Sequence, residues 1–181
     1  MTIEIRPVTA AELHRLTDAL AEILWACVQA GASVSFILPF SHPDAARFWS
    51  DQVFPAVQRG DIILFGAFVD GELQGTAQLA VAQPPNQQRR ADVAKLLVHP
   101  KARRGGLGRA LMLALETEAQ HHGKTLLVLD TRSGDPSQRL YESLGYQVAG
   151  TIPGYCRNPS ADVFEATTYL YKVLDPAAIA P

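Results

Sequence analysis

The most informative stretch of the sequence is Arg103-Arg104-Gly105-Gly106-Leu107-Gly108-Arg109-Ala110. It joins a predicted strand over 92–98 to a predicted amphipathic helix that starts at residue 107 and closes at residue 123. Its glycines allow backbone N–H groups to approach a ligand, and the first turn of a helix has unpaired N–H groups and a dipole that favour an anion. Its arginines add fork-shaped donors that suit phosphate oxygens. The pattern predicts a phosphate or pyrophosphate site. The alternative is a tight turn with solvated arginines.

Two other phosphate-binding motifs are absent from the sequence. The hexapeptide over 106–111 lacks the third glycine of the dinucleotide fingerprint, and no acidic residue stands at the usual place downstream. The tripeptide Gly123-Lys124-Thr125 imitates the end of a P-loop, but it leads from a predicted helix into a predicted strand, which is the opposite order. A dinucleotide or nucleoside-triphosphate site of either kind is therefore not expected.

On both sides of this turn the chain alternates short strands and helices. Asp70-Gly71 has the residue types of a two-residue hairpin turn, and it separates two apolar runs. We predict strands over 3–5, 63–69, 73–81, 92–98, 125–130, 146–152 and 163–174, and helices over 13–27, from 41, over 107–123 and over 136–144. The prediction is one mixed α/β (α+β) domain over residues 1–175, with a mostly antiparallel sheet, followed by a flexible tail over 176–181.

The composition narrows the classes of partner. The chain has 181 residues, 48% of them hydrophobic, and a formal net charge of −2. This net charge does not favour nucleic acid or an anionic membrane as a binding partner. The cysteines, Cys27 and Cys156, are too few for a disulfide scaffold or a four-cysteine zinc site, and no metal is expected. No apolar run is long enough for a membrane span, so we expect a cytoplasmic protein.

Three segments together resemble the GNAT superfamily of N-acetyltransferases. Arg103-x-x-Gly106-x-Gly108 matches the acyl-CoA motif of that superfamily, and the segments 93–100 and 140–146 are similar to its flanking segments at the usual separations. Further segments over 31–34, 77–79, 95–96, 129–131 and 153–156 resemble the tabtoxin-resistance acetyltransferases within it. The resemblance covers nearly the whole chain.

The resemblance implies that acetyl-CoA is the cosubstrate and assigns roles to residues. Leu97 and Val98 would offer backbone groups to the acetyl carbonyl and the pantetheine amides, where an N–H stabilises negative charge on the thioester oxygen. Tyr141 matches the tyrosine beside the coenzyme sulfur and is the candidate general acid. Its alternative role is ordinary packing against the sheet. The pyrophosphate would be held by Arg103, Arg104, Gly105, Gly106, Leu107, Gly108, Arg109 and Ala110.

The general base has two candidates. Asp92 begins a strand where relatives often carry glutamate, and its shorter reach would require a bridging water. Asp130 ends the next predicted strand, near the place where a parallel pair of strands leaves a crevice. Either could instead attract a substrate ammonium, cap a turn or pair with an arginine. A second departure is Gly134, which stands where many relatives have a coenzyme-contacting asparagine.

The function implied is transfer of an acetyl group to the primary amine of a small molecule, in a ternary complex. The tabtoxin-resistance likeness suggests an amino-acid or dipeptide-like acceptor, including a toxin or antibiotic, drawn into a pocket formed by 31–40, 78–86 and 153–157. The alternatives are a protein N-terminal or lysine acetyltransferase and a non-catalytic acyl-CoA sensor. A homodimer could form through the last predicted strand, 163–174.

Overall fold

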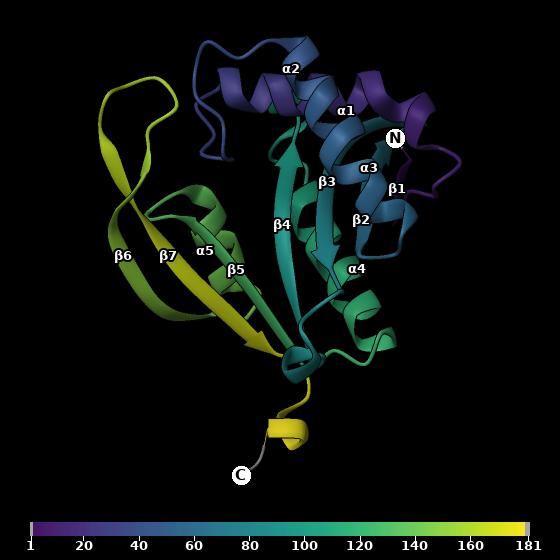
Figure 1. Ribbon diagram of the computed structural model, residues 1–181, viewed down its shortest axis with the longest axis vertical. Coiled ribbons are helices and arrows are strands. Elements are labelled where there is room, and N and C mark those ends of the chain that lie inside the picture. The colour runs from purple at the N-terminus through teal and green to yellow at the C-terminus, as the bar shows by residue number, and fades with distance from the viewer. Residues whose placement is uncertain (1, 180–181) are drawn as a thin grey trace.

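A seven-stranded sheet runs through the computed structural model, which describes residues 2–179 (Figure 1). The strand order is β1-β2-β3-β4-β5-β7-β6, and among the described strands only the β4–β5 pair is parallel. The strands are β1 (Ile3–Pro7), β2 (Ile62–Val69), β3 (Glu72–Ala80), β4 (Arg90–Val98), β5 (Leu126–Arg132), β6 (Gln147–Arg157) and β7 (Phe164–Val173). The helices are α1 (Leu13–Gln29), α2 (His42–Arg47), α3 (Phe54–Gln58), α4 (Leu107–His121) and α5 (Pro136–Ser143). The predicted mixed, mostly antiparallel fold is confirmed.

The hairpin between β2 and β3 forms at the predicted place. Asp70 and Gly71 have φ angles of 48° and 86°, which a tight two-residue turn with two left-handed residues requires. The register then pairs Val69 with Glu72 and continues to the pair Ile62 and Ala80. The first helices pack on one face of this hairpin.

The predicted second helix is divided into parts. Ser41 and Asp44 form a capping box at the start of α2. A π-helical turn over Phe48–Val53 follows, and Pro55 then lies in the first turn of α3. The first turn of a helix tolerates proline because its missing N–H needs no partner there. The wide turn thus lets the chain restart a helix at a residue that an uninterrupted helix would not accept.

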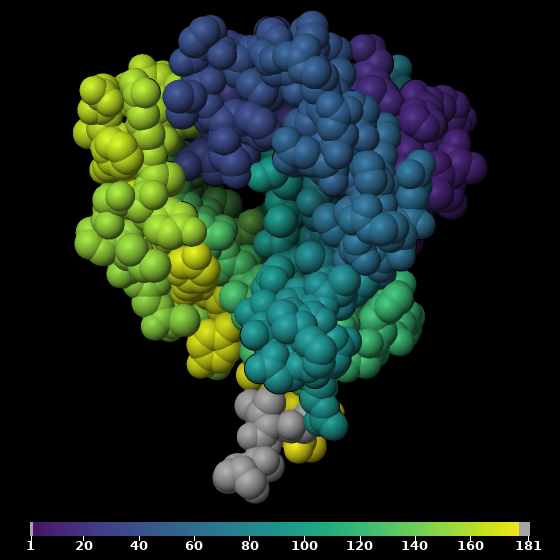
Figure 2. Space-filling model, in the orientation of Figure 1, coloured from purple at the N-terminus to yellow at the C-terminus, as the bar shows by residue number. Residues whose placement is uncertain are grey.

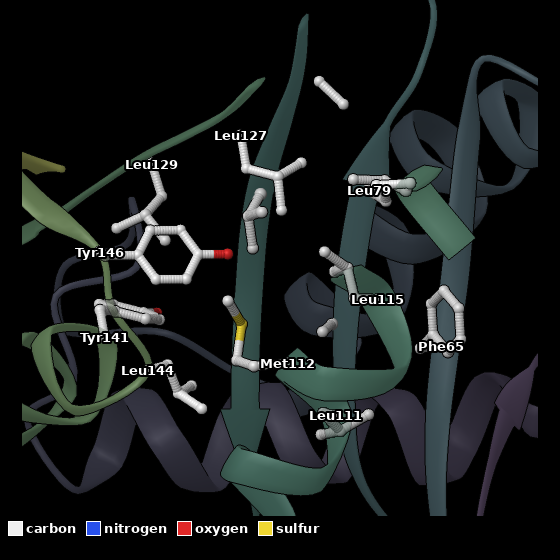
Figure 3. Close-up of a cluster of buried hydrophobic side chains, with 14 of the residues drawn as sticks. Phe65, Leu79, Leu111, Met112, Leu115, Leu127, Leu129, Tyr141, Leu144 and Tyr146 are labelled. Atoms are coloured by element: carbon white, nitrogen blue, oxygen red, sulfur yellow. The ribbon is translucent and has the colours of Figure 1, made fainter. Parts of the chain in front are cut away.

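The helices cover the two faces of the sheet with separate apolar cores. On one face α4 and α5 pack on β3, β4 and β5 around Leu111, Leu115 and Leu127 (Figure 3). On the other face α1, α2 and α3 pack around Leu24 and Trp49, whose indole N–H donates to the Leu20 carbonyl at 2.9 Å. No helix over residues 2–179 is long and apolar enough to cross a membrane.

Strands β4 and β5 pair only at their beginnings. The register joins Arg90 to Leu126 and ends at Asp92 and Val128, although β4 continues to Val98 and β5 to Arg132. Beyond these pairs the two strands diverge, as Figure 1 shows. The sheet is therefore open in the middle, between the end of β4 and the end of β5.

The order of the last strands corrects the expectation about a dimer. Strand β7 lies inside the sheet, between β5 and β6, so both of its edges are already paired. The free edge on this side belongs to β6. In the predicted tail, Pro176–Ile179 form a 3-10 turn, and residues 180–181 lie outside the described residues.

Candidate functional site

The turn between β4 and α4 presents backbone N–H groups to its surroundings. A 3-10 turn over Pro100–Ala102 follows β4, and the chain then passes through the left-handed residues Arg104 (φ 66°) and Gly106 (φ 81°). Gly106 is the N-cap residue of α4, and no side chain from residues 2–179 caps the helix there. The first hydrogen bond of the helix joins the Ala110 N–H to the Gly106 carbonyl, so the N–H groups of 107–109 have no partner within the helix. Unpaired donors and a helix dipole in this arrangement favour an anion.

Two glycines of this turn contribute in different ways. Gly106 has a φ that favours glycine, and a Cβ built on it would meet no atom within 4 Å. At Gly108 a Cβ would lie 3.3 Å from Leu140 Cδ2 of α5 and 3.9 Å from Val98 Cγ2 of β4. Gly106 therefore leaves open space beside the N–H groups, whereas Gly108 lets α5 pack against the beginning of α4.

The three arginines of the turn have different partners. Arg103 Nε donates to the Val98 carbonyl at 3.2 Å, and Arg109 Nη2 donates to Ser143 Oγ of α5 at 2.6 Å. The exposed side chain of Arg104 has no partner within the described part of the chain. Arg103 and Arg109 therefore hold the turn against β4 and α5, while the Arg104 guanidinium is available to a ligand.

The end of β4 directs one residue's backbone toward the opening. The His99 N–H donates to a carbonyl of β3, so the alternation of the ladder turns the backbone groups of Leu97 toward β3 and those of Val98 away from it. The Val98 carbonyl accepts from Arg103 and, at 3.4 Å, from the Cys27 thiol. The Val98 N–H is then the main-chain donor that faces the diverging strands.

Tyr141 projects from α5 into the core beneath the opening (Figure 3). Its side chain is buried beside Tyr146, with ring centroids 5.8 Å apart. Burial raises the pKa of the Tyr141 phenol, and the negative charge of Asp130 raises it further. The phenol is therefore protonated at neutral pH, which is the state that a general acid requires.

The structure separates the two candidate bases. Asp92 lies in the paired part of β4, where Gln83 Nε2 and Arg90 Nη2 contact its carboxylate at 3.1 and 3.3 Å. Asp130 lies beyond the last β4–β5 pair and accepts a hydrogen bond from Thr167 Oγ1 at 2.8 Å. Only Asp130 among these two carboxylates acts on the pKa of Tyr141.

Gly134 has no side chain with which to contact a coenzyme, and its backbone N–H already has a partner within the protein. Gly134 has a φ of 81° in the turn before α5, and its N–H donates to Gln138 Oε1 at 2.8 Å. The turn is therefore organised by a side chain of the helix that follows it.

Two further side chains, those of Tyr169 and Lys95, are close enough to Asp130 for its charge to act on their pKa values, and the sequence alone assigned no role to either. The hydrogen bond with Tyr155 raises the pKa of Tyr169 to about 12, together with burial and the charge of Asp130. Burial lowers the pKa of Lys95, and Asp130 acts against this shift. One signal for Lys95 was present, because a charged residue interrupts the apolar run of its strand. Its placement depends on a bulge in β4 that no sequence pattern indicated.

The loop after α1 and the β6–β7 hairpin meet above the opening. The Leu38 N–H donates to the Pro159 carbonyl at 2.8 Å, and Ser33 Oγ lies 3.5 Å from Cys156 Sγ. Figure 2 shows a hollow bounded by this loop in dark blue, by the teal strands and by the yellow hairpin. Two of the three segments predicted to form an acceptor pocket thus come together, although 153–157 belong to β6 rather than to a loop.

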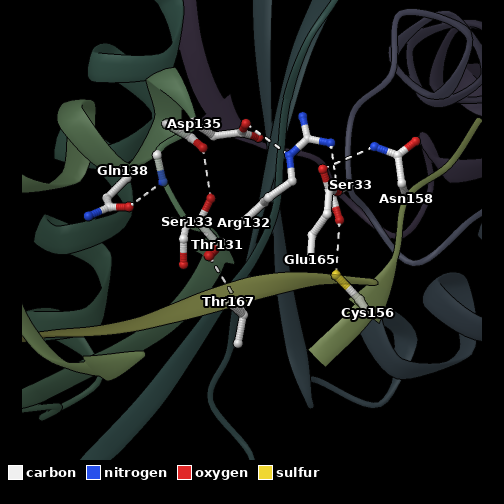
Figure 4. Close-up of polar contacts among 12 residues, drawn as sticks. Ser33, Thr131, Arg132, Ser133, Asp135, Gln138, Cys156, Asn158, Glu165 and Thr167 are labelled. Atoms are coloured by element: carbon white, nitrogen blue, oxygen red, sulfur yellow. Dashed lines mark hydrogen bonds and ion pairs between the residues drawn. The ribbon is translucent and has the colours of Figure 1, made fainter. Parts of the chain in front are cut away.

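Ion pairs fasten the hairpin to the end of β5 (Figure 4). Arg132 contacts Asp135 at 2.9 Å and Glu165 of β7 at 3.1 Å, and Asn158 donates to the same Glu165 at 3.0 Å. These contacts fix one wall of the hollow. Over the described residues, no group of His, Cys, Asp and Glu side chains is arranged to hold a metal ion.

Comparison with known proteins decides the family. The model of the acetyltransferase (GNAT) family matches residues 18–146, which contain β4, the glycine-rich turn, α4 and Tyr141. The chain belongs to the GNAT family of acetyltransferases. This GNAT protein is 35% identical over 136 residues to an uncharacterized N-acetyltransferase from the hisH–hisA intergenic region of Azospirillum brasilense, covering 73% of this chain and 76% of the relative.

Solved structures share the fold at lower sequence identity. An N-acetyltransferase from Staphylococcus aureus Mu50 superposes with a TM-score of 0.79 at 20% identity, covering 97% of this GNAT chain and 100% of the other. A Salmonella typhimurium protein solved with its cofactor acetyl-CoA gives a TM-score of 0.77 at 21% identity, covering 97% and 96%. These likenesses establish the GNAT fold over nearly the whole chain.

Proposed function

We propose that this GNAT protein transfers the acetyl group of acetyl-CoA to the primary amine of a small, amino-acid or dipeptide-like molecule. The observation that carries the proposal is the convergence of three features on the β4–β5 opening. These are the anion site at the start of α4, the protonated phenol of Tyr141 and the carboxylate of Asp130. In an acyl transfer from a coenzyme to an amine, the first would bind the coenzyme, the second would protonate the leaving thiolate and the third would take a proton from the amine.

The residues of the turn fit a pyrophosphate. The N–H groups of 107–109 are unpaired within the helix, a Cβ at Gly106 would enter open space, and the Arg104 guanidinium has no protein partner in residues 2–179. We assign the coenzyme site to residues 103–110, with Arg103 and Arg109 shaping it, and to the backbone of 97–98. Acetyl-CoA would supply an acetyl group activated as a thioester.

Three groups of the chain would stabilise charge and transfer protons during the reaction. The Val98 N–H is oriented to stabilise negative charge on the acetyl oxygen. Asp130 faces the opening and is placed to attract an ammonium and to take its proton, directly or through a water, so that the amine is neutral when it attacks. Tyr141 holds a proton for the departing thiolate, and its buried surroundings keep that proton in place. Asp92 is the second candidate base.

A panel of amines tests the proposed function. Free thiol released from acetyl-CoA is measured with amino acids, dipeptides, polyamines and peptides bearing a free N-terminus or lysine, and the best product is checked by its acetyl mass shift. We expect turnover with amino acids or dipeptides. Turnover with peptides alone would identify a protein acetyltransferase. Coenzyme binding without thiol release from any amine would identify an acyl-CoA sensor.

Replacing Gly106 with alanine tests the anion site. The new methyl group enters the open space beside the N–H groups, so we expect coenzyme A to bind at least about tenfold more weakly, or about 1.4 kcal/mol. Gly123→Ala is the matched control, because Gly123 also has a positive φ (66°) and open space but follows the other end of α4. Each variant loses about 1–2 kcal/mol of folding free energy to the left-handed conformation. Calorimetric titration of both variants with coenzyme A measures the difference. Equal affinities of the two variants for coenzyme A would show that Gly106 is not part of the site.

A further inference from the structure

Lys95 has a backbone conformation that ordinary strand residues avoid. The register pairs Ala94 with Gln78 and Leu97 with Thr76, so β4 has an extra residue in this interval, and Lys95 has a φ of 50°. A left-handed conformation costs a residue with a side chain about 1–2 kcal/mol. Such strain gathers at binding and catalytic sites, where the surrounding structure maintains it. The bulge redirects the chain at the place where β4 leaves β5.

The ammonium group of Lys95 is half-buried between a serine hydroxyl and two aromatic rings, and it has no anionic partner among residues 2–179. Its Nζ donates to Ser35 Oγ at 3.1 Å and lies 5.9 and 5.6 Å from the ring centroids of Phe36 and Phe48. No carboxylate from residues 2–179 comes within ion-pair distance of this ammonium. Burial disfavours its charge and lowers its pKa, against the opposing influence of Asp130. A cation in such a place would be stabilised by an anion from a ligand.

Asp130 is the opposite charge on the other side of the opening. Its carboxylate accepts from Thr167 and forms no ion pair with any described residue. The charge of Asp130 acts on the pKa of Lys95, but the two side chains form no ion pair, since they stand on the two strands that diverge. The hollow in Figure 2 lies between the loop that holds Ser35 and Phe36 and these strands.

A third polar group, Gln78, stands on β3 opposite the start of the β4 bulge. Gln78 of β3 is 5% exposed, and its Nε2 has no hydrogen-bond partner among the described residues. The register places Gln78 opposite Ala94, the residue that precedes Lys95. A buried amide donor without a partner is rare and suits the second oxygen of a carboxylate.

We propose that Lys95 binds the carboxylate of an α-amino-acid-like acceptor whose ammonium group faces Asp130. The inference rests on the proposed acetyltransferase function and narrows its substrate to zwitterions. A free amino acid or dipeptide presents both charges, and the rings of Phe36 and Phe48 provide apolar surface beside them. A carboxamide or ester of the same molecule lacks the negative charge.

The test compares each amino acid or dipeptide of the panel with its own C-terminal carboxamide. The amine of a carboxamide is less basic and hence more often neutral, so chemistry alone favours the carboxamide. We expect the wild-type kcat/KM to favour the free carboxylate by about 10- to 100-fold, since hydrogen bonds to charged groups are the strong ones. Turnover without this preference would overturn the inference and leave the proposed function standing. No thiol release from any amine would overturn both.

Variants at position 95 separate binding from support of the loop. Lys95→Met keeps the unbranched apolar stem of the side chain and removes the terminal ammonium group with its charge. We expect it to abolish the preference, because KM rises much more for the carboxylate than for the carboxamide. Lys95→Arg should keep part of the preference. Equal losses for carboxylate and carboxamide in Lys95→Met would show that Lys95 only supports the loop over 35–36, and would refute the proposal.

Discussion

Tyr141→Phe is expected to lower kcat by about 10²- to 10⁴-fold while the affinity for coenzyme A stays at the wild-type level. The variant removes one hydroxyl group and keeps the ring that packs in the core. Because burial and Asp130 raise the pKa of Tyr141, the phenol is a protonated donor across the working pH range. Without it the departing thiolate must take its proton from water, and the loss falls on kcat rather than on binding.

Tyr146→Phe is the matched control for this variant. Tyr146 packs against Tyr141 in the same cluster, and its pKa is also raised, by burial and by the neighbouring carboxylate of Glu116. Its charged neighbours, Glu116 and Lys172, belong to an ion pair away from Asp130. We expect near wild-type kcat for Tyr146→Phe, measured as thiol release at saturating acetyl-CoA. Similar losses in the two variants would assign the effect to packing, and an unchanged kcat in Tyr141→Phe would remove Tyr141 from the mechanism.

The elements that local chemistry determines could be predicted from the sequence. Asp70-Gly71 forms a tight turn wherever it separates two apolar strands, and Gly106 opens a helix because the left-handed conformation favours glycine. The glycine-rich turn also predicted where α4 begins, and no side chain from residues 2–179 caps the helix there. These features depend on a few neighbouring residues, so the order of residue types is sufficient.

Features that depend on contacts between distant parts of the chain could not be predicted. Whether β7 or β6 ends the sheet depends on which strand pairs with β5, and both have apolar residues. The guanidinium of Arg103 donates to the Val98 carbonyl of β4 instead of being free for a ligand. An arginine is equally suited to bind a carbonyl or a phosphate, so the residue type alone does not distinguish the two roles. The left-handed conformation of Lys95 lies in a bulge of β4, which depends on how β4 pairs with β3. The sequence also cannot distinguish Asp92 from Asp130 as the base, because it does not show that Asp92 lies in the paired part of β4 and β5 and that Asp130 lies beyond it.

Asp130→Asn is expected to lower kcat/KM by at least about 10²-fold and to remove the acidic limb of its pH profile. A carboxylate that must be ionised to take a proton makes the rate fall as pH falls, and asparagine cannot lose or gain that proton. The substitution keeps an oxygen that can accept from Thr167, so the local structure should be retained. It also removes one of the two causes that raise the pKa of Tyr141, although burial continues to hold the phenol protonated.

Asp92→Asn provides the comparison, because the two variants make the same chemical change on the two parallel strands. Asp92 already has Gln83 and Arg90 as partners, and it lies where β4 and β5 are still paired, so it cannot reach an acceptor in the opening without a bridging water. We expect Asp92→Asn to keep the acidic limb and to lose much less activity than Asp130→Asn. Profiles of kcat/KM against pH for both variants measure this directly. If the limb disappears in Asp92→Asn and persists in Asp130→Asn, the base is Asp92 acting through water, and Asp130 serves only to attract the ammonium group.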